Sequence, residues 1–75
     1  MPSARDELEG RLYVAIMQDP RNRNIPIANL TKGLGNLTMT DHRKAAAGVV
    51  QDLRRRGVTA KVEATRTNFV VTLST

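Results

Sequence analysis

Seven residues between positions 40 and 55 share one side of a predicted helix. At 100° per residue they fall on a single arc, which contains Thr40, Arg43, Lys44, Ala47, Gln51, Arg54 and Arg55. Arg43 and Lys44, in the first turns, can reach a phosphate oxygen or the edge of a guanine. Ala47 and Gly48 are small, so a duplex could approach the helix closely. The arc therefore has the chemistry of a nucleic-acid-binding surface.

For the other arginines the sequence allows two interpretations, a nucleic-acid contact or a structural or solvated charge. Arg66 lies in the short polar segment Thr65–Asn68, and an arginine on such a narrow loop can enter a minor groove or simply keep the tip soluble. The run Arg54–Arg56 can contact phosphate or complement the helix macrodipole at a C-terminus. We expect Arg21 and Arg23 to be solvated loop charges, with contact to a nucleic-acid backbone as the alternative.

Residues for catalysis or metal binding are sparse. The single histidine, His42, falls on the packing side of the same helix and has no cysteine or second histidine to join it. No Ser-His pairing is visible, and Gly33-Leu34-Gly35 lacks the third glycine of a dinucleotide-binding loop. We therefore expect no enzyme activity, no cofactor, no metal and no small-molecule substrate.

Composition supports a small basic binding protein. A chain of 75 residues makes one domain, and 12 Lys+Arg against 7 Asp+Glu give a net charge of +5, which favours polyanionic partners. Aromatic residues make up only 3% of the chain, which disfavours base stacking on single strands. The longest apolar stretch, Leu12 to Met17, is too short to span a membrane. We expect a cytoplasmic protein, associated with the nucleoid if it is bacterial.

The first predicted helix covers about residues 4–18. Ser3 and Asp6 form a possible capping box at its start, and the apolar stripe contains Leu8, Leu12, Ala15 and Ile16. Asp19-Pro20 ends the helix, and a polar loop from Arg21 to Asn24 follows. A second apolar side, with Tyr13, Val14 and Met17, faces either another subunit or a core that packs on both sides of the helix.

Two more helices are predicted, at about 27–33 and 39–56. Ile25-Pro26-Ile27 is either an edge strand or the entry to the first of them, which Gly33 and Gly35 stop. The other helix starts at a possible capping box of Thr38 and Asp41 and ends at Gly57. Asp41 would repel phosphate, and we interpret it as a capping residue.

Near the end of the chain, hydrophobicity alternates with a period of two residues, as in β-strands. Apolar residues alternate with polar ones from Val58 to Ala64 and again from Phe69 to Leu73. The polar segment between them is typical of a hairpin loop, so an antiparallel hairpin is predicted over about 58–73. Its apolar face must lie on the helices, because a lone hairpin is marginally stable.

This order of elements resembles the winged helix-turn-helix family of bacterial and phage regulators. The resemblance spans nearly the whole chain and is most specific from Ile27 to Gly35, from Thr38 to Gly57 and in the strand pair. It implies an α+β domain of three helices with a C-terminal β-hairpin wing, in which helix 39–56 enters the major groove of double-stranded DNA. Thr40, Arg43, Lys44 and Ala47 match the recognition positions, and Arg66 matches the wing tip. It also implies a transcriptional regulator or architectural factor. Because a half-site on one small module rarely gives high specificity, we expect a homodimer, tandem copies or a cooperative assembly on DNA.

A different class of function fits the same fold. A winged helix can serve as an inhibitor or adaptor whose basic face meets an acidic protein. Membrane-surface association ranks below both hypotheses, because no helix combines a broad apolar face, aromatic anchors and an opposing lysine-rich face.

Overall fold

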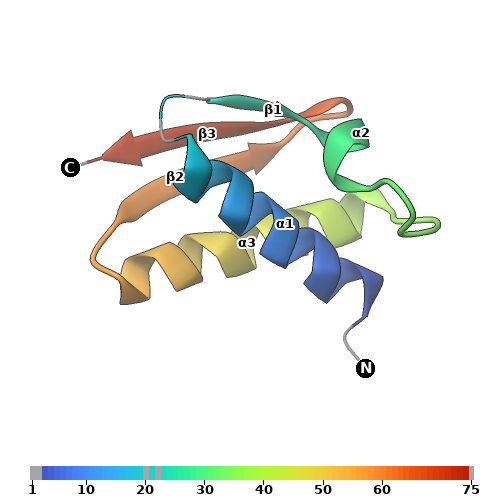
Figure 1. The fold of residues 1–75 in the computed structure, drawn as a ribbon, viewed down its shortest axis with the longest axis horizontal. Coiled ribbons are helices and arrows are strands. Elements are labelled where there is room, and N and C mark those ends of the chain that lie inside the picture. Colours follow the sequence, from blue (N-terminus) through green and yellow to red (C-terminus); the bar gives the residue numbers. More distant parts are fainter. Residues whose placement is uncertain (1–2, 20, 22, 75) are drawn as a thin grey trace.

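The residues that the structure describes fold into three helices and three strands, which makes this a small α+β protein. The computed structural model describes residues 3–19, 21 and 23–74. The elements, in chain order, are α1 (Ala4–Gln18), β1 (Asn24–Pro26), α2 (Ile27–Leu30), α3 (Met39–Arg55), β2 (Thr59–Ala64) and β3 (Asn68–Ser74). Helices α1 and α3 pack on each other to one side of the three strands (Figure 1).

The sheet is antiparallel with the strand order β1-β3-β2. The predicted hairpin forms as β2 and β3, and β1 adds a third strand on the far edge, with Ile25 opposite Phe69. Pro26 ends β1 and is also the N-cap of α2. Ile25-Pro26-Ile27 is thus both an edge strand and a helix entry, because proline is tolerated at an edge and just ahead of a helix.

Helix α1 begins and ends where its sequence predicts. The Ser3 hydroxyl accepts a hydrogen bond from the Asp6 backbone N–H at 3.2 Å, which confirms the capping box. At the other end, the Asp19 N–H donates to the Ala15 carbonyl, while Pro20 and Asn22 lie outside the described residues. On the second apolar side, Tyr13 is half-buried and packs against the core, whereas Val14 and Met17 remain 50% and 46% exposed, so the core covers only part of this side.

Helix α2 is a single turn and stops at Leu30, whereas the sequence predicts a helix to Gly33. Thr31 is its C-cap, with φ of −101° and ψ of 4°, and its backbone N–H and hydroxyl both donate to the Ile27 carbonyl, at 3.0 and 3.1 Å. Gly33 and Gly35 then take positive φ values of 79° and 77°, which break the helical path. A longer, non-helical connection than predicted therefore leads to α3.

Both ends of α3 have the predicted signals. Thr38 and Asp41 form the capping box, and the C-terminus closes in a Schellman motif. In that motif the Gly57 N–H donates to the Arg54 carbonyl at 3.0 Å and the Val58 N–H donates to the Leu53 carbonyl at 2.9 Å. Gly57 has a φ of 82°, which a residue with a side chain rarely adopts. These caps determine where α3 ends and where β2 begins.

The core lies between the two long helices and one face of the sheet. Its fully buried large side chains are Phe69, Leu8, Leu12, Leu53, Val49 and Val71. Along β3 the side chains alternate, with Phe69 and Val71 buried while Val70 and Thr72 are exposed on the other face. The helices therefore cover one face of the sheet, and α3 lies over β2 with its outer side uncovered.

Candidate nucleic-acid interface

Helix α3 has two sharply different sides, as its sequence predicts. Ala45, Ala46, Val49 and Leu53 are buried, and Met39, His42 and Val50 are half-buried. All residues of the opposite arc are exposed, and we call them the outer face: Thr40, Arg43, Lys44, Ala47, Gln51, Arg54 and Arg55. One continuous surface, about four turns long, thus contains the residues singled out from the sequence, apart from Arg66.

Most cations of the outer face are not engaged by acidic side chains. Arg43, Lys44 and Arg54 make no ion pair with any described residue. Arg55 lies 3.9 Å from Asp52, but its side chain is 78% exposed, so this pair is loose. These charges are therefore free to meet an anionic partner.

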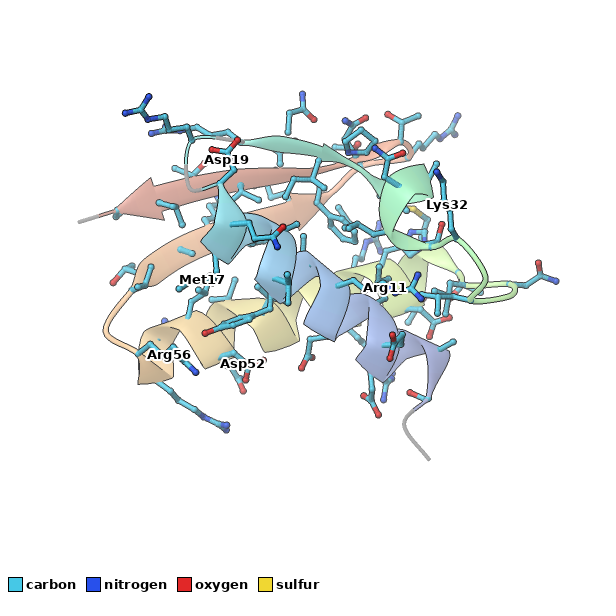
Figure 2. The ribbon with its side chains drawn as sticks, viewed as in Figure 1. Arg11, Met17, Asp19, Lys32, Asp52 and Arg56 are labelled. Atoms are coloured by element: carbon cyan, nitrogen blue, oxygen red, sulfur yellow. The ribbon has the colours of Figure 1, made fainter. Side chains whose placement is uncertain are left out.

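Other arginines hold the fold together. Arg11 on α1 donates to the carbonyl of Leu30 at 3.1 Å and to that of Lys32 at 2.7 Å, and it also pairs with Glu7 at 3.4 Å. Figure 2 shows Arg11 extending from α1 toward the segment that carries Lys32. This side chain ties α1 to the end of α2, a role that its sequence position does not reveal.

Arg56 also has a partner within the protein. Its guanidinium carbon lies 5.7 Å from the centre of the Tyr13 ring, which is a cation–π distance. Figure 2 shows Arg56 at the C-terminal end of α3. Neither sequence interpretation of the arginine run included this contact, which separates Arg56 from Arg54 and Arg55.

Arg66 is presented by a tightly ordered hairpin tip. The Thr65 hydroxyl donates to the Asn68 carbonyl and accepts from the Asn68 N–H, both at 3.0 Å. The Thr67 carbonyl accepts from the Ile27 N–H at 2.9 Å, so the tip is attached to the start of α2. Arg66 itself is exposed and makes no ion pair with the residues that the structure describes.

The hairpin tip lies close to the N-terminal part of α3. A hollow of about 420 Å³ separates them, lined by Ile27, Ala28, Thr31, Gly35, Asn36, Leu37, His42, Arg66 and Thr67. Residues from the tip, from α2, from the connection after it and from α3 thus converge on one place. Arg66 therefore flanks the end of α3 that carries Arg43 and Lys44.

Asp41 is a capping residue, as interpreted from the sequence. Its carboxylate accepts hydrogen bonds from the Thr38 N–H at 3.0 Å and from the Thr38 hydroxyl at 3.1 Å. These bonds lower the pKa of Asp41 below its ordinary value, and the charges of Arg5 and Lys44 lower it further. The ionised form of the carboxylate is therefore favoured, and it is hydrogen-bonded to Thr38 at the start of the helix.

Gly48 does not belong to the outer face, which corrects its sequence interpretation. The Glu9 carboxylate of α1 lies in the space that a Cβ on Gly48 would occupy. Partial burial raises the pKa of Glu9, and the charge of Asp52 and a hydrogen bond to it act in the same direction. Gly48 therefore allows α1 to place a carboxylate against α3. On the outer face, only Ala47 remains as the small residue that lets a partner approach the helix closely.

His42 packs inside, as predicted. Its ring meets Phe69 edge-on, with 6.1 Å between centroids and 73° between planes, and its buried Nδ1 has no hydrogen-bond partner among the described residues. In the described part of the chain, no three His, Asp or Glu side chains form a group that could hold a metal ion. The geometry thus shows a charged outer surface and an inward-facing histidine.

Comparison of the chain with models of protein families, with curated proteins and with solved structures finds no match. Across residues 3–19, 21 and 23–74, no helix has both the length and the apolar character needed to cross a membrane.

Proposed function

We propose that this protein binds double-stranded DNA as a winged helix-turn-helix domain, with α3 in the major groove and the β2–β3 hairpin as the wing. The observation that carries the proposal is the outer face: Arg43, Lys44 and Arg54 are exposed and unpaired by any described acidic residue. The element order and the sheet order β1-β3-β2 support the same arrangement.

The dimensions of α3 suit this role. Arg43 and Arg54 are separated by about 16 Å along the helix axis at 1.5 Å per residue, and the major groove is about 12 Å wide. Cations at the two ends of the face can therefore contact the phosphates on either side of the groove. Ala47, between them, lets the helix approach the bases.

The hairpin tip supplies the second contact. Arg66 projects from a tip whose backbone is held by Thr65 and by the bond from Ile27 to Thr67. Because the backbone of the tip is ordered before binding, placing Arg66 on the DNA backbone or in the minor groove costs the entropy of its side chain but little backbone entropy. Regulation of transcription and a DNA-architectural role both follow from such binding.

Fluorescence anisotropy of a labelled random duplex, measured at several salt concentrations, tests the proposal. Each phosphate neutralised contributes about −0.9 to the slope of log affinity against log salt. Replacing both Arg43 and Lys44 by alanine should weaken binding by about tenfold or more and reduce the slope by about 1 to 2. The fold should be unaffected, because both side chains are exposed.

The matched control removes the same charge elsewhere. Arg21 and Arg23 precede β1, the edge strand farthest from β2, on which α3 packs. Their double alanine variant should retain most of the affinity. Equal losses in both variants would point to unspecific charge attraction. A folded protein that binds no duplex at low salt would refute the proposal and favour an acidic protein as the partner.

A further inference from the structure

The two edges of the sheet are built differently. The β1 edge is only three residues long and ends in Pro26. The β2 edge has six residues and no proline, and its register with β3 runs without a bulge from Thr59 opposite Ser74 to Ala64 opposite Phe69. Short edges, prolines and bulges prevent a strand from pairing with another chain. The β1 edge has two of these protections. The β2 edge has none of the three, but it carries Lys61 and Glu63, and charged residues also hinder pairing unless the incoming strand places the opposite charge against each.

The hydrogen bonds of β3 show which backbone groups of β2 are open. The Val71 N–H donates to the Arg23 carbonyl, on the β1 side of β3, so the backbone of Val70 and Thr72 points toward β2. Their partners Glu63 and Lys61 therefore direct their backbone groups inward, to β3.

The alternate residues of β2 thus direct their N–H and C=O groups away from the sheet. These are Ala60, Val62 and Ala64. Among the described residues, no backbone hydrogen bond outside the sheet involves them. An open ladder of this kind is the donor and acceptor pattern that another antiparallel strand requires.

We propose that β2 pairs antiparallel with β2 of a second copy of this chain, centred on Val62. In that register Val62 faces Val62 of the second copy, and Ala60 faces its Ala64. Each of these pairs joins residues with outward backbone groups, so each exchanges two hydrogen bonds. The two sheets become one sheet of six strands, three from each copy.

The side chains of β2 complement themselves in this register. Lys61 faces Glu63 of the second copy, and Glu63 faces its Lys61, at the close spacing of about 4.5 Å between Cα atoms that non-hydrogen-bonded pairs have. Within one copy Lys61 and Glu63 already lie 3.3 Å apart, with side chains 76% and 63% exposed. Pairing thus converts one exposed ion pair per copy into a cross-strand network.

On the helix-covered face, the pairing buries small apolar groups. Val62 and Ala64 are half-buried and line a groove of about 340 Å³ with Arg43, Ala46 and Glu63. A second β2 would lie along this groove and cover Val62 and Ala64, while Arg43, which also lines the groove, belongs to the outer face as well. Since both copies keep this face on the same side, both α3 helices lie on one side of the joined sheet. The proposal does not depend on DNA binding.

Analytical ultracentrifugation of the whole chain tests it by charge reversal. Lys61→Glu and Glu63→Lys should each weaken the dimer by about tenfold, because like charges then face each other twice. Lys61→Glu lowers the net charge from +5 to +3, and the weaker repulsion between copies would by itself strengthen the dimer. The proposed contact predicts a weaker dimer, so the two effects are distinguished by their sign.

Restoring opposite charges across the interface tests the register of the two strands. An equimolar mixture of the Lys61→Glu and Glu63→Lys proteins should form a heterodimer, and the double variant should regain the homodimer. A wild-type chain that is monomeric up to about 1 mM at moderate salt would overturn the proposal. So would a dimer whose affinity is unchanged by both reversals, since β2 would then not be its interface.

Discussion

The charged residues on the α1 side of α3 and those on its outer face differ in what they contact. On the α1 side, Arg56 covers the Tyr13 ring, and Glu9 of α1 lies against Gly48 beside Asp52. On the outer face, Arg43, Lys44 and Arg54 contact no acidic partner among the described residues. The charges facing α1 are therefore engaged in contacts within the fold, and those facing outward are available for binding. Variants on each side of α3 test this division.

The largest expected effect is on Arg11, whose contacts join α1 to the end of α2. Arg11→Ala removes hydrogen bonds to the carbonyls of Leu30 and Lys32. Because hydrogen bonds to charged groups contribute more than neutral ones, the free energy of unfolding should fall by about 2 kcal/mol. Urea denaturation followed by circular dichroism measures this loss.

The control for that variant lies on the outer face. Arg54→Ala removes the same charge from an exposed side chain without an ion-pair partner in the described structure, so it should change stability by less than about 0.5 kcal/mol. Its affinity for duplex DNA should fall, whereas Arg11→Ala, assayed below its denaturation midpoint, should bind normally. Equal destabilisation by the two variants would contradict the division.

Two threonines separated by one residue give a sharper comparison. The Thr38 hydroxyl accepts from the Asp41 N–H and donates to its carboxylate, whereas Thr40 is exposed on the outer face. Thr38→Ala should cost about 1 kcal/mol of stability, the usual effect of losing an N-cap. Thr40→Ala should leave stability unchanged or slightly raised, because alanine favours helix. Thermal unfolding of both variants distinguishes them.

The effect of Thr38→Ala should also depend on pH. The pKa of Asp41 is lower in the folded protein than in the unfolded chain, so the cap stabilises fully above the unfolded value. As pH falls through the folded value, the carboxylate is protonated and the contribution is lost. The backbone N–H of residue 38 still donates to the carboxylate in Thr38→Ala, so of the bonds to the carboxylate only that from the hydroxyl is lost. The gap between wild type and Thr38→Ala should therefore narrow in acid, and a constant gap would mean that the hydroxyl does not act through the charge of Asp41.

Sequence reasoning succeeded where the signals are local. Both capping boxes join residues three apart, and the Schellman motif needs only Gly57, so the bounds of α1 and α3 could be predicted. The outer face followed from helical periodicity. The class of the fold follows from these elements.

Contacts between distant residues were not accessible in the same way. Pairing of Ile25 with Phe69 depends on the whole chain being folded, and so does the reach of Arg11 to the Lys32 carbonyl. The role of Gly48 was misread, because periodicity gives the angle of a residue but not the identity of its neighbour on the next helix. Which cations are engaged is likewise a property of tertiary structure.

The smallest expected effect concerns Glu9, the carboxylate that α1 places on α3. Partial burial, together with the charge and the hydrogen bond of Asp52, raises its pKa in the folded protein. Folding therefore favours the protonated form, and ionisation of Glu9 costs stability as pH rises from the unfolded value through the folded one. Glu9→Gln keeps the shape and removes the charge, so it should stabilise by about 0.5 kcal/mol or less at neutral pH.

The pH dependence of that gain separates a charge effect from a packing effect. In acid both the wild type and Glu9→Gln are uncharged at this position, so their unfolding free energies should converge, and the gap should open as pH rises. A gain that persists unchanged in acid would show that the amide simply packs better on Gly48. A loss at neutral pH would mean that the Glu9 carboxylate is stabilising there, so that its contacts outweigh the cost of burying its charge beside Asp52.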